Sequence, residues 1–290
     1  MPDNNTESIT KAEPENQTIE FPKKHLHRQR AHCNPLSDSF IPYPENPRHV
    51  NWFKRYPSVC EKEHYMQFNS YSWYVNLEDE NYPKVDFLDV GCGYGGLLIY
   101  LSKLYPNKLS LGMEIRDKVT NYVGKRIISL REQNPGEYLN ISVVRTNSMK
   151  FLPNYLGKNQ LEKIFFCFPD PHFKRSNWRR RIVNYPLLSL YAYFLKPGGR
   201  IYIGIVNLTA LIHYIILISS VIVTDVLVTD VYELYVWMEN ALEDHPLFEP
   251  LKDSDKEKDE CFLNFDKETE EGKKNEKMQS TTYKNVYRRK

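Results

Sequence analysis

The chain has 290 residues, 41% of them hydrophobic and 26% charged, a composition typical of globular proteins that excludes a wholly disordered or fibrous chain. The formal net charge is only +2, so any nucleic-acid site must be a local basic patch. The five cysteines are scattered without any C-x-x-C spacing, which predicts neither a disulfide framework nor a metal site and favours a reducing compartment. Residues 1–20 are polar, so no secretory signal peptide is expected.

Composition divides the chain into three parts. Residues 1–24 are rich in Asn, Thr, Glu and Pro and indicate a disordered arm, and residues 25–83 indicate an irregular basic and aromatic arm and linker. Residues 84–290 are expected to form one domain. Within it, residues 252–277 carry many charges of both signs and predict a solvated loop.

Strand and helix patterns alternate from residue 84 to residue 200, which predicts an α/β fold with a mostly parallel, doubly wound sheet. A final strand or arm is expected at residues 281–288. Ligands of such sheets bind at the carboxyl ends of the strands, so motifs at those ends are the candidates for a site. The other expected elements are strands at 85–90, 109–113, 141–145, 161–168 and from 200 onward, and helices at 97–104, 116–133 and 178–195.

A glycine-rich loop follows the first expected strand and opens the first helix. Gly91, Gly93 and Gly96 satisfy the spacing G-x-G-x-x-G, and glycines let a ligand approach the backbone closely. Glu114 ends the second strand about 20 residues further on, where a carboxylate accepts hydrogen bonds from ribose hydroxyls. The pattern therefore predicts a cofactor that contains a nucleoside.

A dinucleotide and S-adenosylmethionine both suit this loop, and a purely structural tight turn is the third alternative. Asp89 favours S-adenosylmethionine, because a carboxylate beside the loop repels a pyrophosphate but attracts an ammonium and a sulfonium group. Asn147 and Ser148 follow the third strand and are expected to hydrogen-bond an adenine edge, with a polar turn before a helix as the alternative. No metal ion is expected.

A second motif, F-F-C-F-P-D-P-H-F-K at residues 165–174, ends the fourth strand. Asp170 stands between two prolines, which stiffen the backbone and hold the carboxylate in place beside the methyl donor. The basic cluster that follows, with Trp178 inside it, suits a phosphate backbone and a stacked base; the alternative is a solvated helix face. Its cations are Lys174, Arg175, Arg179, Arg180 and Arg181.

Together with further segments in the same order, these motifs resemble the tRNA (guanine-N7-)-methyltransferase family, catalytic subunit, in its eukaryotic form. The resemblance covers residues 26–200 and 229–250 and a short stretch near residue 269. The matching segments are R-Q-R-A-H (28–32) with N-P (34–35), D-V-G-C-G-Y-G-G-L-L (89–98), G-M-E-I-R (112–116), N-S-M-K (147–150), F-P-D-P-H-F-K (168–174), A-Y (192–193), T-D-V (229–231), W-M (237–238), H-P-L-F (245–248) and T-E-E-G-K-K (269–274).

The resemblance implies a Rossmann-like class I S-adenosylmethionine-dependent methyltransferase that methylates N7 of a guanosine in the tRNA variable loop (EC 2.1.1.33). It places the catalytic aspartate at Asp170, and it implies a partner, a non-catalytic WD-repeat β-propeller subunit. The last three residues of the implied cofactor site belong to a C-terminal segment that the family folds back onto cofactor and substrate. The cofactor-site residues that it implies are Gly91, Glu114, Ile115, Arg116, Asn147, Ser148, Cys167, Thr269, Glu270 and Glu271.

Residues 203–228 depart from the family pattern, which runs from the fifth strand almost directly to T-D-V. No Asp, Glu, Lys or Arg occurs from residue 201 to residue 223, a length that could span a bilayer. A translated intron or splice product is favoured by the repeated V-T-D-V at 223–226 and 228–231. A genuine packed insertion is the second interpretation. A membrane segment is disfavoured, because the flanking strand and helix belong to one core.

Two other functions stay open beside the methylation of tRNA. The insert allows a catalytically impaired isoform that still binds tRNA or its partner subunit. A methyltransferase for a protein or a small molecule is the other alternative, and the basic cluster argues against it. Short basic clusters at residues 23–24 and 288–290 favour a nuclear localisation, with solvated chain ends as the alternative.

Overall fold

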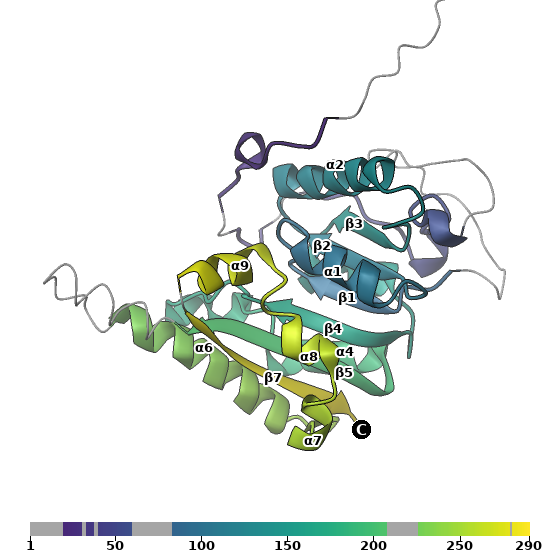
Figure 1. Ribbon diagram of the computed structural model, residues 1–290. Coiled ribbons are helices and arrows are strands. Elements are labelled where there is room, and N and C mark those ends of the chain that lie inside the picture. The colour runs from purple at the N-terminus through teal and green to yellow at the C-terminus, as the bar shows by residue number, and fades with distance from the viewer. Residues whose placement is uncertain (1–19, 31–32, 38–39, 60–82, 208–225, 279) are drawn as a thin grey trace, which may run out of the picture.

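A computed structural model describes residues 20–30, 33–37, 40–59, 83–207, 226–278 and 280–290 (Figure 1). Residues 1–19 of the arm expected at 1–24, residues 60–82 of the expected linker and most of the apolar insert lie outside the described residues. Within the described part, one seven-stranded sheet has the strand order β3-β2-β1-β4-β5-β7-β6. The first five strands in that order run parallel, while β7 is antiparallel to both of its neighbours. The predicted α/β architecture and the predicted final strand are both confirmed.

The strands are β1 (Phe87–Val90), β2 (Ser110–Glu114), β3 (Ile141–Arg145), β4 (Leu161–Cys167), β5 (Leu195–Asn207), β6 (Phe248–Pro250) and β7 (Thr281–Arg289). The α-helices are α1 (Gly96–Leu104), α2 (Asp117–Gln133), α3 (Ser148–Tyr155), α4 (Tyr185–Phe194), α6 (Val226–Glu243), α7 (Asp253–Lys256), α8 (Glu260–Asn264) and α9 (Glu270–Lys277). The 3-10 helices are η1 (Lys24–His27), η2 (Pro47–His49), η3 (Pro57–Val59) and η4 (Arg175–Arg180).

The core has two sides because successive residues of a strand point to opposite faces of the sheet. On β4, Phe165 packs toward α1 and α8, whereas Phe166 packs toward α4 and α6. Trp52 and Tyr56 of the N-terminal arm join the second side and are buried. Both faces of the central strands are therefore covered, which explains why their sequences read as continuous apolar runs rather than alternating ones.

The helix predicted at residues 178–195 is wrong in its first third. The chain forms η4, passes through an extended Arg181, and begins α4 only at Tyr185. Asn184 causes this late start, because its side chain accepts a hydrogen bond from the N–H of Leu187 (3.1 Å) and caps the helix. Pro186 lies in the first turn, where its fixed φ favours a helix start.

The solvated loop predicted at residues 252–277 is also wrong. The segment folds into α7, α8 and α9, and it buries Cys261, Phe265 and Asn275. Most of its charged residues face outward, as the charge pattern predicts, but the few apolar residues between the charges anchor it in the core. In Figure 1 this yellow-green segment runs back across the sheet toward the glycine loop.

The sheet takes up the first five residues of the expected insert. Ile203 to Asn207 continue β5 and pair with β7. Residues 208–225 lie outside the described residues, and α6 begins at Val226. Among the helices of the described ranges, none has the length and apolar character needed to cross a membrane.

A buried polar cluster fastens the C-terminal segment to the sheet. Asp259 accepts hydrogen bonds from Arg200 and from the Tyr202 hydroxyl (2.6 Å), and Lys163 donates to that hydroxyl (2.6 Å). Burial alone would raise the pKa of Asp259, but Lys163, Tyr202 and Arg200 together lower it below its ordinary value. The ionised carboxylate is therefore the form that stabilises the fold.

Asp259→Asn is expected to reduce the free energy of unfolding by about 3 kcal/mol at pH 7, because it leaves the partly buried Lys163 and Arg200 without their counter-charge. A carboxyl whose folded pKa is depressed stabilises the protein above its unfolded pKa and loses that contribution as the pH falls. The difference between variant and wild type should therefore shrink below about pH 4. Urea unfolding at several pH values measures it, with Asp253→Asn, an exposed aspartate of α7, as the control. Equal stabilities at pH 7 would contradict this role.

Candidate active site

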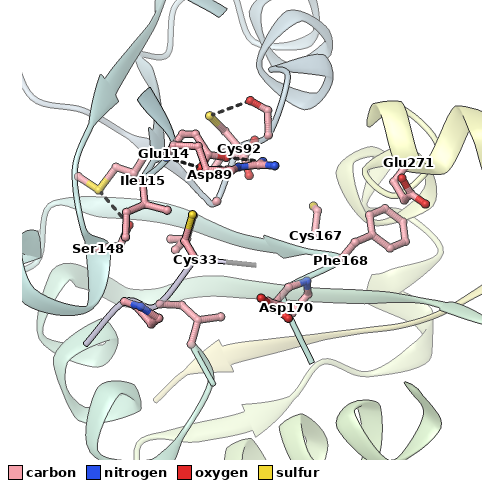
Figure 2. A pocket seen from close by; sticks show the side chains of 18 of the residues that line it. Cys33, Asp89, Cys92, Glu114, Ile115, Ser148, Cys167, Phe168, Asp170 and Glu271 are labelled. Carbon is pink, nitrogen blue, oxygen red and sulfur yellow. Dashed lines mark hydrogen bonds and ion pairs between the residues drawn. The ribbon is translucent and has the colours of Figure 1, made fainter. Parts of the chain in front are cut away.

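A cavity of about 580 Å³ opens at the carboxyl ends of β1, β2 and β4, where ligands bind in such sheets. Its walls come from segments far apart in the sequence: the glycine loop, the ends of three strands, the Asp170 loop, the N-terminal arm and the C-terminal segment. Figure 2 shows Glu114 and Ile115 on one side of it, Cys167 and Asp170 on another, and Glu271 at the far edge. The residues predicted from sequence that line it are Gly91, Glu114, Ile115, Arg116, Asn147, Ser148, Cys167, Asp170, Arg180, Thr269, Glu270 and Glu271.

The glycine loop has the backbone that its sequence predicts. Gly91, Gly93 and Gly95 adopt positive φ angles of 75°, 53° and 80°, a region that other residues rarely adopt. A Cβ atom at Gly91 or Gly93 would meet no protein atom within 4 Å, so this backbone borders open space. A ligand in the cavity can therefore approach the main chain directly.

Asp89 is a buried carboxyl of the cavity wall with an unsatisfied oxygen. The residue is 2% exposed, and its Oδ1 atom has no hydrogen-bond partner among the described residues. Burial, followed by the nearby charges of Glu270 and Glu114, raises the pKa of Asp89 to about 8. A buried carboxyl in this condition gains most from a bound cation, which would favour its ionised form.

Glu114 is held in place by Arg116, two residues further on. The backbone N–H and the Nε–H of Arg116 both donate to Glu114 Oε1, at 2.9 and 3.0 Å, and a terminal N–H donates to Oε2 at 2.8 Å. Glu114 is 3% exposed. Each carboxylate oxygen can accept more than one hydrogen bond, so the pair fixes the orientation of Glu114 and leaves acceptor capacity for ligand hydroxyls.

Asn147 lies in the cavity wall, but its side chain already has protein partners. Its Oδ1 accepts from the N–H of Met149 (3.1 Å) and caps α3, and its Nδ2 donates to the carbonyl of Pro35 in the N-terminal arm (2.5 Å). Ser148 donates its hydroxyl to Met113 Sδ (3.7 Å). Asn147 therefore joins the arm to the sheet, and its contact with an adenine edge stays a prediction.

The loop that carries Asp170 has a strained and braced backbone. Phe168 and His172 both adopt positive φ angles, 53° and 46°, which non-glycine residues rarely do and which cluster at functional sites. The N–H of Phe168 donates to the carbonyl of Gly204 on β5 (2.8 Å), and His172 Nε2 lies 3.9 Å from Asp170 Oδ2. These constraints hold the Asp170 carboxylate at the cavity rim, as its two flanking prolines predict.

The C-terminal segment closes one side of the cavity, as the resemblance implied. Thr269 caps α9 by accepting from the N–H of Gly272 (2.8 Å). Glu270 accepts from the N–H of Gly96 at the start of α1 (3.1 Å), and its other oxygen pairs with Arg126, which also donates to the carbonyl of Tyr94 (2.8 Å). Glu270 thereby ties the segment to the glycine loop.

Gly96→Ala should separate these two elements. An alanine Cβ would lie 2.5 Å from the carbonyl oxygen of Glu268 and 2.9 Å from Glu270, and the backbone contact cannot be relieved by a rotamer change. The C-terminal segment would have to move, which we expect to weaken S-adenosylmethionine binding roughly tenfold and to speed hydrogen exchange in α9. Gly157→Ala, whose Cβ would meet only a side-chain atom at 3.5 Å, is the control. An unchanged affinity of Gly96→Ala for S-adenosylmethionine would contradict the proposed effect of the contact between Gly96 and the C-terminal segment.

The basic cluster does not act as one surface. Lys174, Arg175 and Arg179 are exposed, and Arg180 is half-buried in the cavity wall. Arg181 is only 3% exposed and donates its Nε–H to the carbonyl of Pro171 (3.0 Å). Contrary to the prediction, Arg181 is therefore turned away from any phosphate that approaches the surface.

Sequence reasoning missed the wall that the N-terminal arm provides. Lys24, Cys33 and Pro35 line the cavity, and Lys24 Nζ lies 4.1 Å from the centre of the Tyr94 ring in the glycine loop. The basic and aromatic composition of residues 25–83 predicts an irregular arm. It does not predict which residues the arm contacts, because Lys24 and Tyr94 are seventy residues apart. Arg126, which pairs with Glu270, was missed for the same reason.

The lining fits S-adenosylmethionine in its chemistry. The unsatisfied Asp89 carboxylate suits a cation, Glu114 suits ribose hydroxyls, and the glycine backbone allows close contact. The part of the chain that the structure describes holds no group of three or more His, Cys, Asp or Glu side chains that could bind a metal ion.

Comparisons with known proteins agree with this geometry. A family model described as "Putative methyltransferase" matches residues 83–205, the stretch from the first strand to the fifth. The strand order and the glycine loop are those of a class I S-adenosylmethionine-dependent methyltransferase. Among solved structures, the 16S rRNA methyltransferase KamB is 13% identical with a TM-score of 0.43 and covers 71% of this chain and 87% of its own, which is too weak a likeness to support an argument.

Relatives of known activity match nearly the whole chain. A tRNA (guanine-N(7)-)-methyltransferase of Oryza sativa subsp. indica is 44% identical over 269 residues, covering 93% of this chain and 92% of the relative. That of Arabidopsis thaliana is 42% identical over 281 residues, covering 97% and 96%. That of Yarrowia lipolytica is 43% identical over 280 residues, covering 96% and 81%. The chain therefore belongs to the tRNA (guanine-N(7)-)-methyltransferase family.

Proposed function

We propose that this protein transfers a methyl group from S-adenosylmethionine to N7 of a guanosine in the variable loop of tRNA. The observation that carries the proposal is the position of Asp170, held between two prolines on the rim of the cavity that also contains Asp89 and Glu114. Relatives at 42–44% identity are tRNA (guanine-N(7)-)-methyltransferases, which supports the same reaction.

The residues in the cofactor half of the cavity each have a distinct function in binding S-adenosylmethionine. S-adenosylmethionine supplies, when bound, a methyl group on a positively charged sulfur. Asp89 attracts positive charge, Glu114 accepts from hydroxyls in the orientation that Arg116 sets, and the glycine loop leaves room for the ligand. Glu270 and Thr269 hold the C-terminal segment over the site. Ile115, Ser148 and Cys167 complete the wall.

The substrate half needs no general base. Guanine N7 carries a lone pair and no proton, so the rate depends on the alignment of the nitrogen with the methyl group and on stabilisation of the positive charge that develops on the purine. Asp170 can supply both, by accepting a hydrogen bond from guanine N1 or its amino group and by its negative charge. Glu271 lines the same cavity from the C-terminal segment and is the second carboxylate available to this edge.

The exposed cations next to the cavity give tRNA a place to bind. Lys174, Arg175 and Arg179 extend from the Asp170 loop along η4, and Arg180 connects them to the cavity. We assign the phosphate contacts to these four residues, since cations in such a row neutralise a backbone. By the resemblance, the enzyme works with a WD-repeat β-propeller subunit, and we include that subunit in the proposal together with residence in the nucleus.

A catalytically impaired isoform is not favoured over an active enzyme by any observation on the described residues. β5 and α6, on either side of residues 208–225, pack in the core, and the cavity contains every residue assigned to the cofactor. A deletion that tests the insert should remove only 208–225, because Ile203 to Asn207 pair with β7.

Methyl transfer from labelled S-adenosylmethionine to unmodified tRNA, with the propeller subunit present, tests the proposed function. We expect label in the tRNA and chemical cleavage at a modified guanosine of the variable loop. Activity that appears only after deletion of residues 208–225 would support the family assignment and the impaired isoform. Label in added proteins or small molecules would contradict the proposal if neither the full chain nor the 208–225 deletion variant labels tRNA.

A further inference from the structure

Arg181 lies at the centre of a three-way contact that joins the Asp170 loop to α6. Its guanidinium carbon is 4.8 Å from the ring centre of Trp178 and 4.8 Å from that of Trp237. The two indole rings are themselves 5.2 Å apart and inclined at 58°, so the three side chains form a closed triangle. A buried arginine over two aromatic faces, largely removed from water, is held far more firmly than a surface arginine.

Each member of the triangle is also bonded to the backbone. Arg181 donates its Nε–H to the carbonyl of Pro171, which directly follows Asp170 (3.0 Å). Trp178 donates its ring N–H to the carbonyl of Phe173 (3.3 Å), and Trp237 donates its own to the carbonyl of Val183 (3.0 Å). The triangle therefore holds both ends of the segment 171–183 and fastens it to α6.

The loop needs such a brace because its conformation is unfavourable by itself. Phe168 and His172, on either side of the Pro-Asp-Pro sequence, have positive φ angles, and conformations of this kind persist only when the surroundings enforce them. The Gly204 carbonyl holds the loop at Phe168, and Arg181 holds it at Pro171. Asp170 lies between these two attachment points.

We propose that Arg181 is a positioning residue for methyl transfer, which fixes Asp170 through the Pro171 carbonyl and links the catalytic loop to α6 through Trp178 and Trp237. The proposal rests on the proposed function, since it assigns Asp170 to the guanine. It replaces the phosphate contact expected of Arg181 from the sequence.

The test is Arg181→Lys, assayed with the full chain and the propeller subunit on unmodified tRNA. Lysine keeps the positive charge but has neither the Nε–H that reaches Pro171 nor a planar face for two indoles. We expect kcat to fall at least tenfold, while the Kd for S-adenosylmethionine and the KM for tRNA stay within about twofold. Wild-type transfer to tRNA, measured in the same experiment, establishes the proposed function independently of this result.

Two controls separate positioning from general destabilisation. Arg131→Lys removes another half-buried arginine, which donates to the carbonyls of Tyr138 and Ile141 at 2.8 Å, far from the Asp170 loop. The kcat of Arg131→Lys should stay within about twofold of the wild-type value, even where its Tm falls as much as that of Arg181→Lys. In single-turnover assays, Arg181→Lys added to Asp170→Asn should cause no further loss, because a residue that acts through Asp170 has no effect once Asp170 is replaced.

Three results would overturn the proposal. A raised KM for tRNA with kcat unchanged, together with a smaller dependence of tRNA binding on salt, would mean that Arg181 contacts phosphate. Independent, multiplicative losses in the double variant would mean that Arg181 does not act through Asp170. An equal loss of kcat in Arg131→Lys would mean that destabilisation alone explains the effect.

Discussion

Replacement of Asp170 by asparagine is expected to lower turnover by roughly 100- to 1,000-fold while the Kd for S-adenosylmethionine stays within about twofold. Asparagine fills the same volume between Pro169 and Pro171 but has no negative charge to balance the positive charge that develops on the purine. The cofactor half of the cavity is unaffected, because Asp89 and Glu114 lie on other strands. Rapid-quench measurements of a single turnover, with calorimetric titration of the cofactor, separate the two quantities.

A change in the substrate sharpens this test. Inosine at the target position lacks the exocyclic amino group of guanosine, so it removes one of the two donors that Asp170 can accept from. We expect inosine to slow the wild-type enzyme about tenfold or more and to have little further effect on Asp170→Asn. An equal loss of cofactor affinity and turnover in Asp170→Asn would contradict the role assigned to this carboxylate.

The second large effect is a dependence of cofactor affinity on pH that comes from Asp89. Burial, with the charges of Glu270 and Glu114, raises the pKa of this carboxyl to about 8, so in the free protein it is mostly protonated at pH 7. A cationic ligand favours the ionised form, and a proton must leave when the ligand binds. Affinity should therefore rise with pH, by roughly 50-fold between pH 5.5 and pH 7.5.

Calorimetry in two buffers of different ionisation enthalpy measures the protons released, and we expect close to one proton per cofactor at pH 7. Asp89→Asn should bind more weakly at pH 7.5 and should lose most of the pH dependence. His172 lines the same cavity, and any contribution from its imidazole remains in this variant. A pH profile that is unchanged in Asp89→Asn would show that another group is responsible.

The sequence predicts those parts of the site that lie in recognisable motifs at the ends of strands. The glycine loop, Glu114 and Asp170 each follow a buried strand, and parallel strands bring their carboxyl ends to one edge of the sheet. The role of the C-terminal Thr269, Glu270 and Glu271 came from the resemblance alone. Nothing in their charged surroundings indicates that they return to α1.

The errors have physical causes that single residues illustrate. The charged composition of residues 252–277 predicts a loop, yet Phe265 and Cys261 anchor the segment in the core. Arginines beside a tryptophan predict a phosphate contact for Arg181, whereas Trp237, some fifty residues away, completes a buried contact. Tertiary partners of this kind cannot be inferred from spacing along the chain.

If N7 of a tRNA guanosine receives the methyl group, a single-atom change in the substrate should abolish the transfer. Two tRNAs are prepared that differ only at the target position of the variable loop, one with guanosine and one with 7-deazaguanosine, in which carbon replaces N7. The enzyme, assayed with the proposed propeller subunit, should bind both tRNAs equally but transfer methyl only to the first. Methyl transfer to the 7-deazaguanosine tRNA, at any position and at a similar rate, would contradict the account.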